Sequence, residues 1–525
     1  MVKIMFNIKN QILSILVFTS LMAFMSSCTG DLSTTPLDND VQTSVSVYET
    51  QGDYEQVLAK LYAGLALTGQ SGGSGAPDIQ SDDEGFSNYM RQLFAAQVVS
   101  TDEVVVAWDN PNFQPYNFQS WSASNSFVFM MYSRVYYEIA LANEFIRNAK
   151  GNNDPTIQTY NAEARFLRAL SYWHALDLYG GGVPFVTEND GVGAYNPPSI
   201  SSDSLFNYIE NELLAIEDQL SAPGQGEYGR ANRAAAWTLL TKLYLNAEVY
   251  IGEPHYTEAI TYAKRVIDQG GYQLEDNYQD LFLADNHTAN GIIFAVPSDG
   301  ENMQSYGNTN YIIHASVGGN MSASNFGIDG PWAGNRVTPE FVNKFDLDND
   351  SRAMFFTDGQ TLDIEDPINF QHGYAVTKWQ NITSNGEPGS RPAFVDTDFP
   401  MFRLADVYLM YAEAIERGGQ GGDNSEALSL VNDIRERAYG DASGNITSSE
   451  LDLEFLINER ARELYWENHR RTDLIRFGMF TGSDYIWSWK GEQKDGTATD
   501  AIYNLYPIPS SDINANPNLT QNPGY

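Results

Sequence analysis

Residues 231–269 read ANRAAAWTLLTKLYLNAEVYIGEPHYTEAITYAKRVIDQ, and this segment is the strongest indication of the fold class. Apolar residues recur in it every three or four positions, which is the period of a helix with one buried face. The pattern predicts helices over 231–250 and 257–269, joined by a loop. Two consecutive helices of this kind indicate a helical hairpin, and they favour a mainly α protein.

The spacing within this hairpin resembles that of a tetratricopeptide unit. Trp237, Leu240 and Tyr244 lie at the offsets of the first helix, and Ala259 and Ala263 occupy the second. The connecting loop is longer than the repeat allows, so we interpret the hairpin as a variant unit. A second pair is predicted over 403–417 and 425–439, linked by the Gly-rich turn GGQGGDN.

Further helices are predicted on both sides of these pairs. Apolar spacing places them at 54–67, 159–178, 203–220 (with Asp203 as the N-cap) and 449–468. Residues 270–400 differ, because they have little helical period, many Gly, Asn, Asp and Pro residues, and short β-like runs such as GIIFAVP and YAVTKW. We expect this segment to be a large irregular insertion, and long irregular segments in compact proteins are usually functional.

Composition excludes some classes of function. The chain has 525 residues, with 68 Asp and Glu against 30 Lys and Arg, which gives a formal net charge of −38. Nucleic-acid binding and attachment to anionic membranes both depend on Lys and Arg, so neither is expected. Hydrophobic residues make up 42%, enough for a large core, and the 31 Tyr, 27 Phe and 9 Trp form an unusual aromatic excess.

The amino terminus is typical of an exported lipoprotein. Lys3 and Lys9 precede a short apolar run at 12–24, which predicts a signal peptide over residues 1–27. Cys28 follows Ser26 and Ser27 and is the only cysteine. We expect it to be the lipidated residue, the alternative being a free thiol beside an ordinary cleavage site. Two or more acyl chains would anchor the protein stably in a membrane.

This interpretation also sets the domain organisation. Residues 28–45 are expected to form a lipidated flexible tether, and residues 46–525 a single domain that contains the irregular insertion. With its single cysteine used for lipid, the chain would have no disulfide and no cysteine-based metal site. No other apolar stretch approaches the ~20 residues of a membrane span.

Motifs for catalysis are weak. A GxSxG match at 69–73 follows a predicted helix, whereas a nucleophile elbow needs a preceding strand. The six histidines form no HxxxH or HxH pair, and DLDND at 346–350 lacks the later Gly and Glu of a calcium-binding EF-hand loop. A glycosidase carboxylate pair stays possible among 68 acids, but nothing singles one out. We therefore expect no enzyme activity, no cofactor and no metal.

Charged clusters have a simpler explanation. Arg165, Arg168 and the run ERARE at 459–463 could suggest an anion site. Alternating charges on long helices more often form intramolecular salt bridges, and we interpret them in that way.

Several long segments make the chain resemble the SusD/RagB family. They are AEARFLRALSYWHALDLYGGGVPFV, GRANRAAAWTLLTKLYLNAEVY, FPMFRLADVYLMYAEAIERGG, LINERARELYWENHRRTDLIRFGMF and YPIPSSDINANPNLTQNPGY. The resemblance implies an outer-membrane lipoprotein of Bacteroidetes that captures nutrients, usually glycans, at the cell surface. It implies a SusC-like TonB-dependent transporter as partner. It also implies a scaffold of about four tetratricopeptide-like helical pairs with an irregular, loop-rich ligand-binding half.

The resemblance extends to the starch-binding founding member of the family, through the segments GAPDIQSDDEG, STDEVVVAWDN, SDGENMQSYGNTNYIIH and FTGSDYIWSWKG. In that member an arc of aromatic side chains holds an α-glucan, and the matching positions here are Trp108, Tyr306 and Trp332. Trp108 is followed by Asp-Asn-Pro and Trp332 is flanked by Gly-Pro and Ala-Gly, so both are expected in loops, where side chains tend to be exposed.

The resemblance also supplies polar contacts. Asp83 and Arg91 match two of them, and the asparagine beyond the first tryptophan corresponds to Asn110, one residue early, or to Asn112. The founding member carries calcium in a region that corresponds here to 285–287 and Asp423. A histidine replaces one expected acid there, so no metal is assigned.

The chemistry of sugars agrees with these residues. A pyranose has an apolar C–H face that a Trp or Tyr can cover, and burying ~80 Å² gives roughly 2 kcal/mol per sugar. Asp, Asn and Arg would then hydrogen-bond to the hydroxyls. The sequence therefore predicts non-catalytic binding of starch-type α-glucan. Binding of a β-glucan or fructan, binding of peptides as in the RagB branch, and a surface glycosidase are the alternatives.

Overall fold

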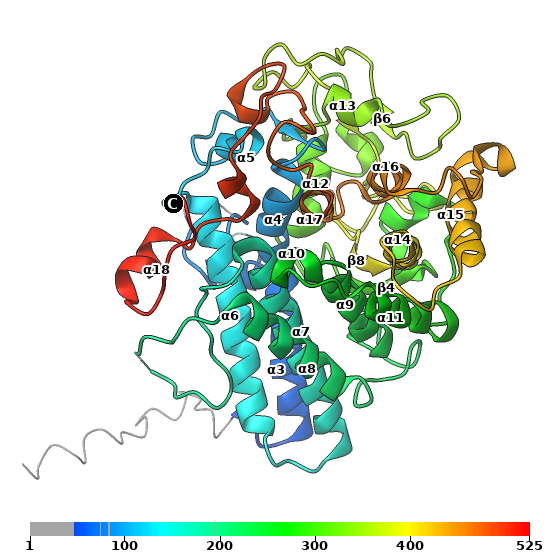
Figure 1. Cartoon of the computed structure of the whole chain (residues 1–525). Coiled ribbons are helices and arrows are strands. Elements are labelled where there is room, and N and C mark those ends of the chain that lie inside the picture. Colours follow the sequence, from blue (N-terminus) through cyan, green and yellow to red (C-terminus); the bar gives the residue numbers. More distant parts are fainter. Residues whose placement is uncertain (1–46, 74, 82–84, 194) are drawn as a thin grey trace, which may run out of the picture. The chain divides into compact units, whose positions relative to one another are not determined.

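Helices α6 (Ser126–Ala149) and α7 (Pro155–Tyr179) pack along each other, and they are the longest helices in the part of the chain that the structure describes (Figure 1). The structure, a computed structural model, describes residues 47–73, 75–81, 85–193 and 195–525. The expected signal peptide (1–27), Cys28, the tether (28–45) and Asp83 lie outside these residues. Residues 54–525 form one compact unit.

Helix α7 confirms the helix predicted over 159–178 and extends it by about one turn at its start. Asp154 caps it, because its side chain accepts the backbone N–H of Thr156 and Ile157, and Pro155 suits the first helical position. The helix ends where Gly180 adopts a φ of 69°. Helix α6 was not among the predicted helices, although Asn125 caps it in the same way.

The helical hairpin predicted over residues 231–269 is present, but its first helix is divided in two. The predicted helix 231–250 is two helices, α9 (Arg233–Leu245) and α10 (Ala247–Ile251), because Asn246 leaves the helical conformation; its side chain and its backbone N–H both donate to the carbonyl of Lys242. Helix α11 (Tyr256–Gln269) packs against α9, and Ala259 and Ala263 are completely buried. Small side chains at these positions let the two helices approach closely.

The second predicted pair is α14 (Leu404–Glu416) and α15 (Asn424–Tyr439), and α14 also packs against α11. The predicted helix 449–468 is shorter: α16 (Leu453–Leu464) begins after the cap Asp452. It ends before Trp466 and Asn468, whose φ values of 62° and 65° interrupt the helix. A further short helix, α17 (Arg470–Arg476), follows.

The remaining helices complete a mainly α architecture. Helix α8 (Ser202–Ile216) joins α7 to α9, and its N-cap is Ser201 rather than the predicted Asp203. The others are α3 (Gln51–Ala66), α4 (Tyr89–Phe94, continued by a π-helical turn over Ala95–Val99), α5 (Gln114–Phe118), α12 (Asn308–Ser316), α13 (Pro339–Val342) and α18 (Ser510–Ala515). No helix within the described ranges has both the length and the apolar character needed to cross a membrane.

Strands are short and occur in antiparallel pairs. Strand β4 (Ile292–Val296) coincides with the run GIIFAVP and pairs with β8 (Phe399–Arg403), so the two ends of the irregular segment meet. Strands β6 (Phe355–Phe356) and β7 (Ala375–Val376) form a second pair. The segment after α3 that carries the GxSxG match contains a hairpin of β1 (Gly69–Ser71) and β2 (Gly75–Pro77), which is not the strand–turn–helix of a nucleophile elbow.

Charged side chains in the helical core pair with one another, as predicted for the run 459–463. Glu463 of α16 bonds to Arg352, Arg403 and Arg437, and Glu459 bonds to Arg352, Arg435 and Arg462. Arg165 and Arg168 both pair with Glu212 of α8. These arginines are therefore structural and not an anion site.

Candidate functional site

A two-residue β-ladder brings two distant segments of the chain together at the candidate site. Strand β3 (Val105–Val106) pairs with β5 (Asn335–Arg336), and beyond it the N–H of Ala107 donates to the carbonyl of Gly334 over 2.7 Å. The residues that follow β3 and precede β5 are therefore neighbours, although more than 200 positions separate them in sequence. These residues include Trp108 and Trp332, two of the predicted aromatic positions.

Trp108 and Trp332 are held together directly. The indole Nε1 of Trp108 donates to the backbone carbonyl of Trp332 over 2.9 Å. The Trp108 ring lies against Gly334, where a Cβ atom would come within 2.6 Å of the ring, so only glycine fits there. Both tryptophans are partly exposed, as expected of side chains that present one face to a ligand.

Tyr306 continues this arrangement. Its ring centroid lies 6.2 Å from that of Trp332 and 5.0 Å from that of Phe394. Tyr306 and Phe394 are also partly exposed. Trp108, Trp332, Tyr306 and Phe394 form what we call the aromatic row. Phe394 was not predicted as a site residue, because it lies in an irregular segment of the sequence and comes next to Tyr306 only in the folded protein.

His314 of α12 supports the row from beneath Trp332. The two rings stack with centroids 4.7 Å apart at 26°, and the N–H of Trp332 donates to the carbonyl of His314 over 2.9 Å. Burial lowers the pKa of His314, so the ring is neutral near pH 7, and its Nδ1 bonds to the carbonyl of Gly330 over 2.9 Å. The packing of His314 fixes the orientation of Trp332.

The predicted polar contacts occupy different positions relative to the row. Arg91 of α4 is buried and lies over the ring of Tyr311 at 4.9 Å, and Tyr311 in turn meets Trp108 edge-on at 6.0 Å. Asn110 is exposed beside Trp108, and its Oδ1 accepts the N–H groups of Asn112 and Phe113. Asn110 therefore shapes the loop that carries Trp108.

The region matched to a calcium site is divided between separate structural roles. Asp285 accepts the N–H and hydroxyl of Ser384, whereas Asp423 caps helix α15. In the described parts of the chain, no three His, Cys, Asp or Glu side chains lie together in an arrangement that could hold a metal ion. The acidic turn at 346–350 is closed by Asp346 bonding to Asp348 and Asn349.

Partly exposed aromatic side chains gather on loops beside a helical scaffold, an arrangement typical of a binding protein, and comparisons with known proteins identify its family. The SusD family matches residues 355–525. The "Starch-binding protein SusD" of Bacteroides thetaiotaomicron is 36% identical, over 98% of this chain and 98% of its own length. The chain belongs to the SusD family, as the sequence resemblance implied.

Solved structures show the same fold. "Surface glycan-binding protein A" of Bacteroides fluxus superposes with a TM-score of 0.70 at 21% identity, over 91% of this chain and 100% of its own. The protein of the same name from B. thetaiotaomicron, solved in complex with laminarihexaose, gives 0.68 at 19% identity, over 90% of this chain and 100% of its own. These relatives are named as binding proteins, in agreement with the prediction that the chain is not an enzyme.

Proposed function

We infer that this protein binds starch-type α-glucan without cleaving it, and that the aromatic row is the binding surface. The observation that carries this inference is the convergence of Trp108, Trp332 and Tyr306, which come from separate loops and each leave part of a ring exposed. The overall similarity to a protein named for starch binding supports the choice of ligand.

The geometry suits a chain of sugars rather than a single one. Each exposed ring can cover the C–H face of one pyranose, which is worth roughly 2 kcal/mol at about 25 cal/mol per Å². Successive rings 5–6 Å apart can contact successive sugars. After the cost of association, the expected affinity is micromolar to millimolar, which allows release to a transporter.

Polar groups would set the orientation of the glycan. Asn110 is exposed next to Trp108 and can bond to a hydroxyl with its amide. We assign Asp83 the same role from the family resemblance. Arg91 acts behind the row, where its guanidinium lies over Tyr311 and holds that ring against Trp108.

The cellular setting follows from the amino terminus and the family. Cys28 would carry the lipid that anchors the protein to the outer membrane at the cell surface, with residues 28–45 as tether. The ligand would pass to a SusC-like TonB-dependent transporter. A single domain over residues 46–525 would then cover the transporter.

A second candidate ligand has a specific observation in its favour. A structural neighbour binds laminarihexaose, so the same scaffold accepts a different glucan in that protein. The loops that carry the aromatic row, and not the helices, would determine which glucan this chain selects.

Affinity electrophoresis tests the proposal. Gels that contain amylopectin, pullulan, laminarin, levan or dextran should retard the protein most strongly with amylopectin. The absence of retardation by amylopectin would contradict the α-glucan assignment, and retardation by laminarin alone would favour the second candidate. Prolonged incubation with starch should release no reducing ends, because their appearance would indicate hydrolysis.

A further inference from the structure

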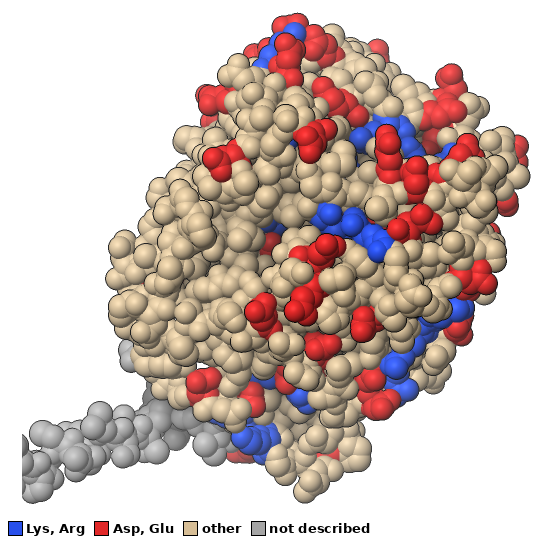
Figure 2. Space-filling model, viewed as in Figure 1, with Lys and Arg blue, Asp and Glu red and all other residues tan. Residues whose placement is uncertain are grey.

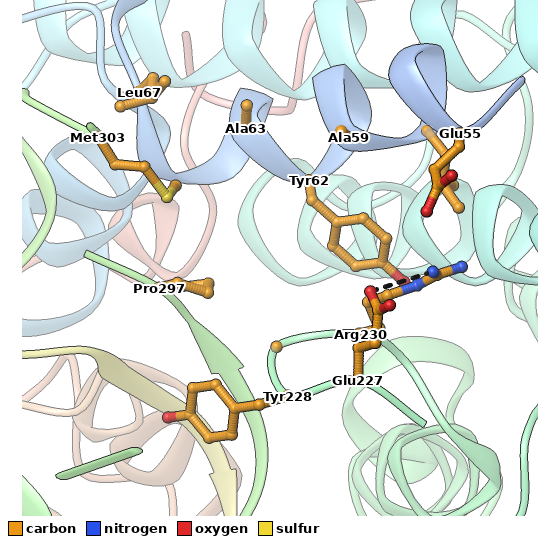
Figure 3. Close-up of a pocket in the computed structure, with 12 residues that line it drawn as sticks. Glu55, Ala59, Tyr62, Ala63, Leu67, Glu227, Tyr228, Arg230, Pro297 and Met303 are labelled. Atoms are coloured by element: carbon orange, nitrogen blue, oxygen red, sulfur yellow. Dashed lines mark hydrogen bonds and ion pairs between the residues drawn. The ribbon is translucent and has the colours of Figure 1, made fainter. Parts of the chain in front are cut away.

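Two neighbouring hollows border the loop that leads to Tyr306, because Met303 of this loop lines both. The first has a volume of about 390 Å³ and the second of about 530 Å³. Tyr228, Pro297 and Met303 line both, so these residues stand between the hollows. Figure 3 shows the first hollow, with Tyr228 facing helix α3 across it and Pro297 and Met303 along one side. We call the two hollows together the Tyr228 groove.

Tyr228 is an exposed aromatic side chain that is held in one position. Its exposed fraction is 45%, high for a large aromatic residue. Its ring meets that of His287, with the ring centroids 6.3 Å apart. The next residue, Gly229, has a φ of 78° and packs so closely on Pro297 that a Cβ atom would lie 2.7 Å from it. A fixed, exposed ring loses little entropy on binding a ligand.

The groove is connected to the aromatic row through the same loops. Met303 precedes Tyr306 by three residues, so their Cα atoms are at most ~11 Å apart. Gly300 lies against the carbonyl of Phe394, the last ring of the row, and also against Ser390 and Asp396 of the second hollow. The loop that supplies Met303 to the groove therefore also supplies Tyr306 to the aromatic row.

The two hollows offer complementary chemistry. The first is mostly apolar, with Leu58, Ala59 and Ala63 of α3 opposite Tyr228. The second has more polar residues in its lining, among them Ser298, Ser390, Asp299 and Asp398. These acids would repel phosphate, sulfate or an acidic sugar, and they accept hydrogen bonds from neutral hydroxyls.

We propose that the Tyr228 groove is an additional sugar subsite, in which the C–H face of a neutral pyranose stacks on Tyr228 and its hydroxyls bond to the Ser and Asp oxygens of the second hollow. The subsite extends the aromatic row and therefore rests on the proposed function. It takes the end of a long oligosaccharide, and it gives the protein a preference for longer chains.

The test compares long and short ligands by isothermal titration calorimetry. Maltoheptaose and maltotriose are the probes, with laminarihexaose as an alternative long probe if the protein prefers that glucan. Tyr228→Ala removes the stacking ring, and Tyr228→Phe keeps it. Tyr195→Ala is the matched control, because Tyr195 is also 45% exposed but lies outside the groove.

Tyr228→Ala should weaken maltoheptaose binding about tenfold and leave maltotriose binding unchanged. Tyr228→Phe and Tyr195→Ala should bind both probes as the wild type does. Equal loss for both probes, or unchanged maltoheptaose binding by Tyr228→Ala, would overturn the subsite while leaving the aromatic row intact. If the wild type bound neither glucan, the proposed function itself would fail, a result that is distinct from the other two.

Discussion

At the scale of single residues, Trp332 is the central residue of the proposed binding surface, because it contacts both Trp108 and Tyr306 of the aromatic row. It receives the indole N–H of Trp108, stacks on His314 and faces Tyr306. Because of these contacts its own ring is fixed before a sugar arrives, so little rotamer entropy is lost on binding.

Replacing Trp332 or Trp108 by Ala should weaken maltoheptaose binding at least tenfold, because each change removes about 2 kcal/mol of stacking. Calorimetry measures the loss. Phe129→Ala serves as the control, since Phe129 is a 38% exposed aromatic on α6, away from the row. The helical circular dichroism should not change in any of these variants. Full binding by both tryptophan variants would show that the row is not the binding surface.

His314→Ala tests whether the support beneath the row matters. The change leaves the exposed face of Trp332 intact but removes the stacked ring and the bond to Gly330. We expect glucan affinity to fall several-fold and the fluorescence of Trp332 to broaden as the indole gains freedom. His314→Phe restores a stacking ring and should recover most of the affinity. Wild-type affinity in His314→Ala would show that His314 does not contribute to glucan binding.

The sequence predicted Trp108, Tyr306 and Trp332 as partners, because their motifs resemble those of known relatives. Phe394 and His314 could not be found in this way. Phe394 follows Pro392 in a segment with no periodic pattern, and the sequence around His314 does not reveal that its ring stacks on Trp332. Their roles arise from contacts between distant segments, which residue spacing does not encode.

At the scale of elements, α16 shows how the helical half is fixed. Glu463 is fully buried and receives hydrogen bonds from Arg352, Arg403 and Arg437, at distances of 2.6–3.1 Å. Burial by itself would raise the pKa of Glu463, but Arg437, Arg403 and Arg352 lower it to about 2. Three elements that are distant in sequence are thus attached to one helix.

Glu463→Gln should destabilise the protein by about 3–5 kcal/mol, because it leaves buried arginines without their partner. Urea unfolding at pH 7 measures the change. Glu454→Gln is the control, since Glu454 is an exposed residue of the same helix and should alter stability by less than about 0.5 kcal/mol. Equal effects of the two changes would contradict a special role for the buried cluster.

The same carboxylate predicts a pH dependence. Its pKa is about 2 in the folded protein and about 4.3 in the unfolded chain, so the unfolded state binds the proton more tightly. Its contribution to stability is present above about pH 4.3 and is lost as the pH falls towards 2. The free energy of unfolding should therefore decline between pH 5 and pH 2.5, and the decline should be smaller in Glu463→Gln. An identical slope in both proteins would contradict this assignment.

Periodicity in the sequence predicted α7, α11, α14 and α15 within a few residues, because each has a regular apolar face. It missed the boundaries that single side chains set. Asn246 divides the predicted helix 231–250 by bonding to Lys242, and Trp466 and Asn468 shorten the predicted helix 449–468 through positive φ values. Such local competition overrides a pattern that averages over many residues.

At the scale of the whole molecule, the net charge of −38 is spread out. Figure 2 shows Asp and Glu side chains scattered over the visible face, with small groups of Lys and Arg between them. Many of the arginines are used in buried pairs, such as Arg352, Arg403 and Arg470. The charge thus identifies no ligand, and the aromatic residues carry the functional signal.

The proposed anchor gives a prediction at this scale. Cys28→Ser should move the protein from the membrane fraction to the medium or periplasm of its host, because two acyl chains are what hold a protein of this kind stably. Fractionation followed by immunoblotting measures the shift. Glucan binding by the purified variant should equal that of the wild type. Membrane retention of Cys28→Ser would contradict lipidation at this position.

A crystal structure of the protein with maltoheptaose would test most directly whether the aromatic row binds the glucan. We expect sugar density along the aromatic row, with pyranose C–H faces against Trp332, Tyr306 and Trp108 and a hydroxyl near Asn110. Density for the oligosaccharide at any other surface, with the row empty, would contradict this expectation.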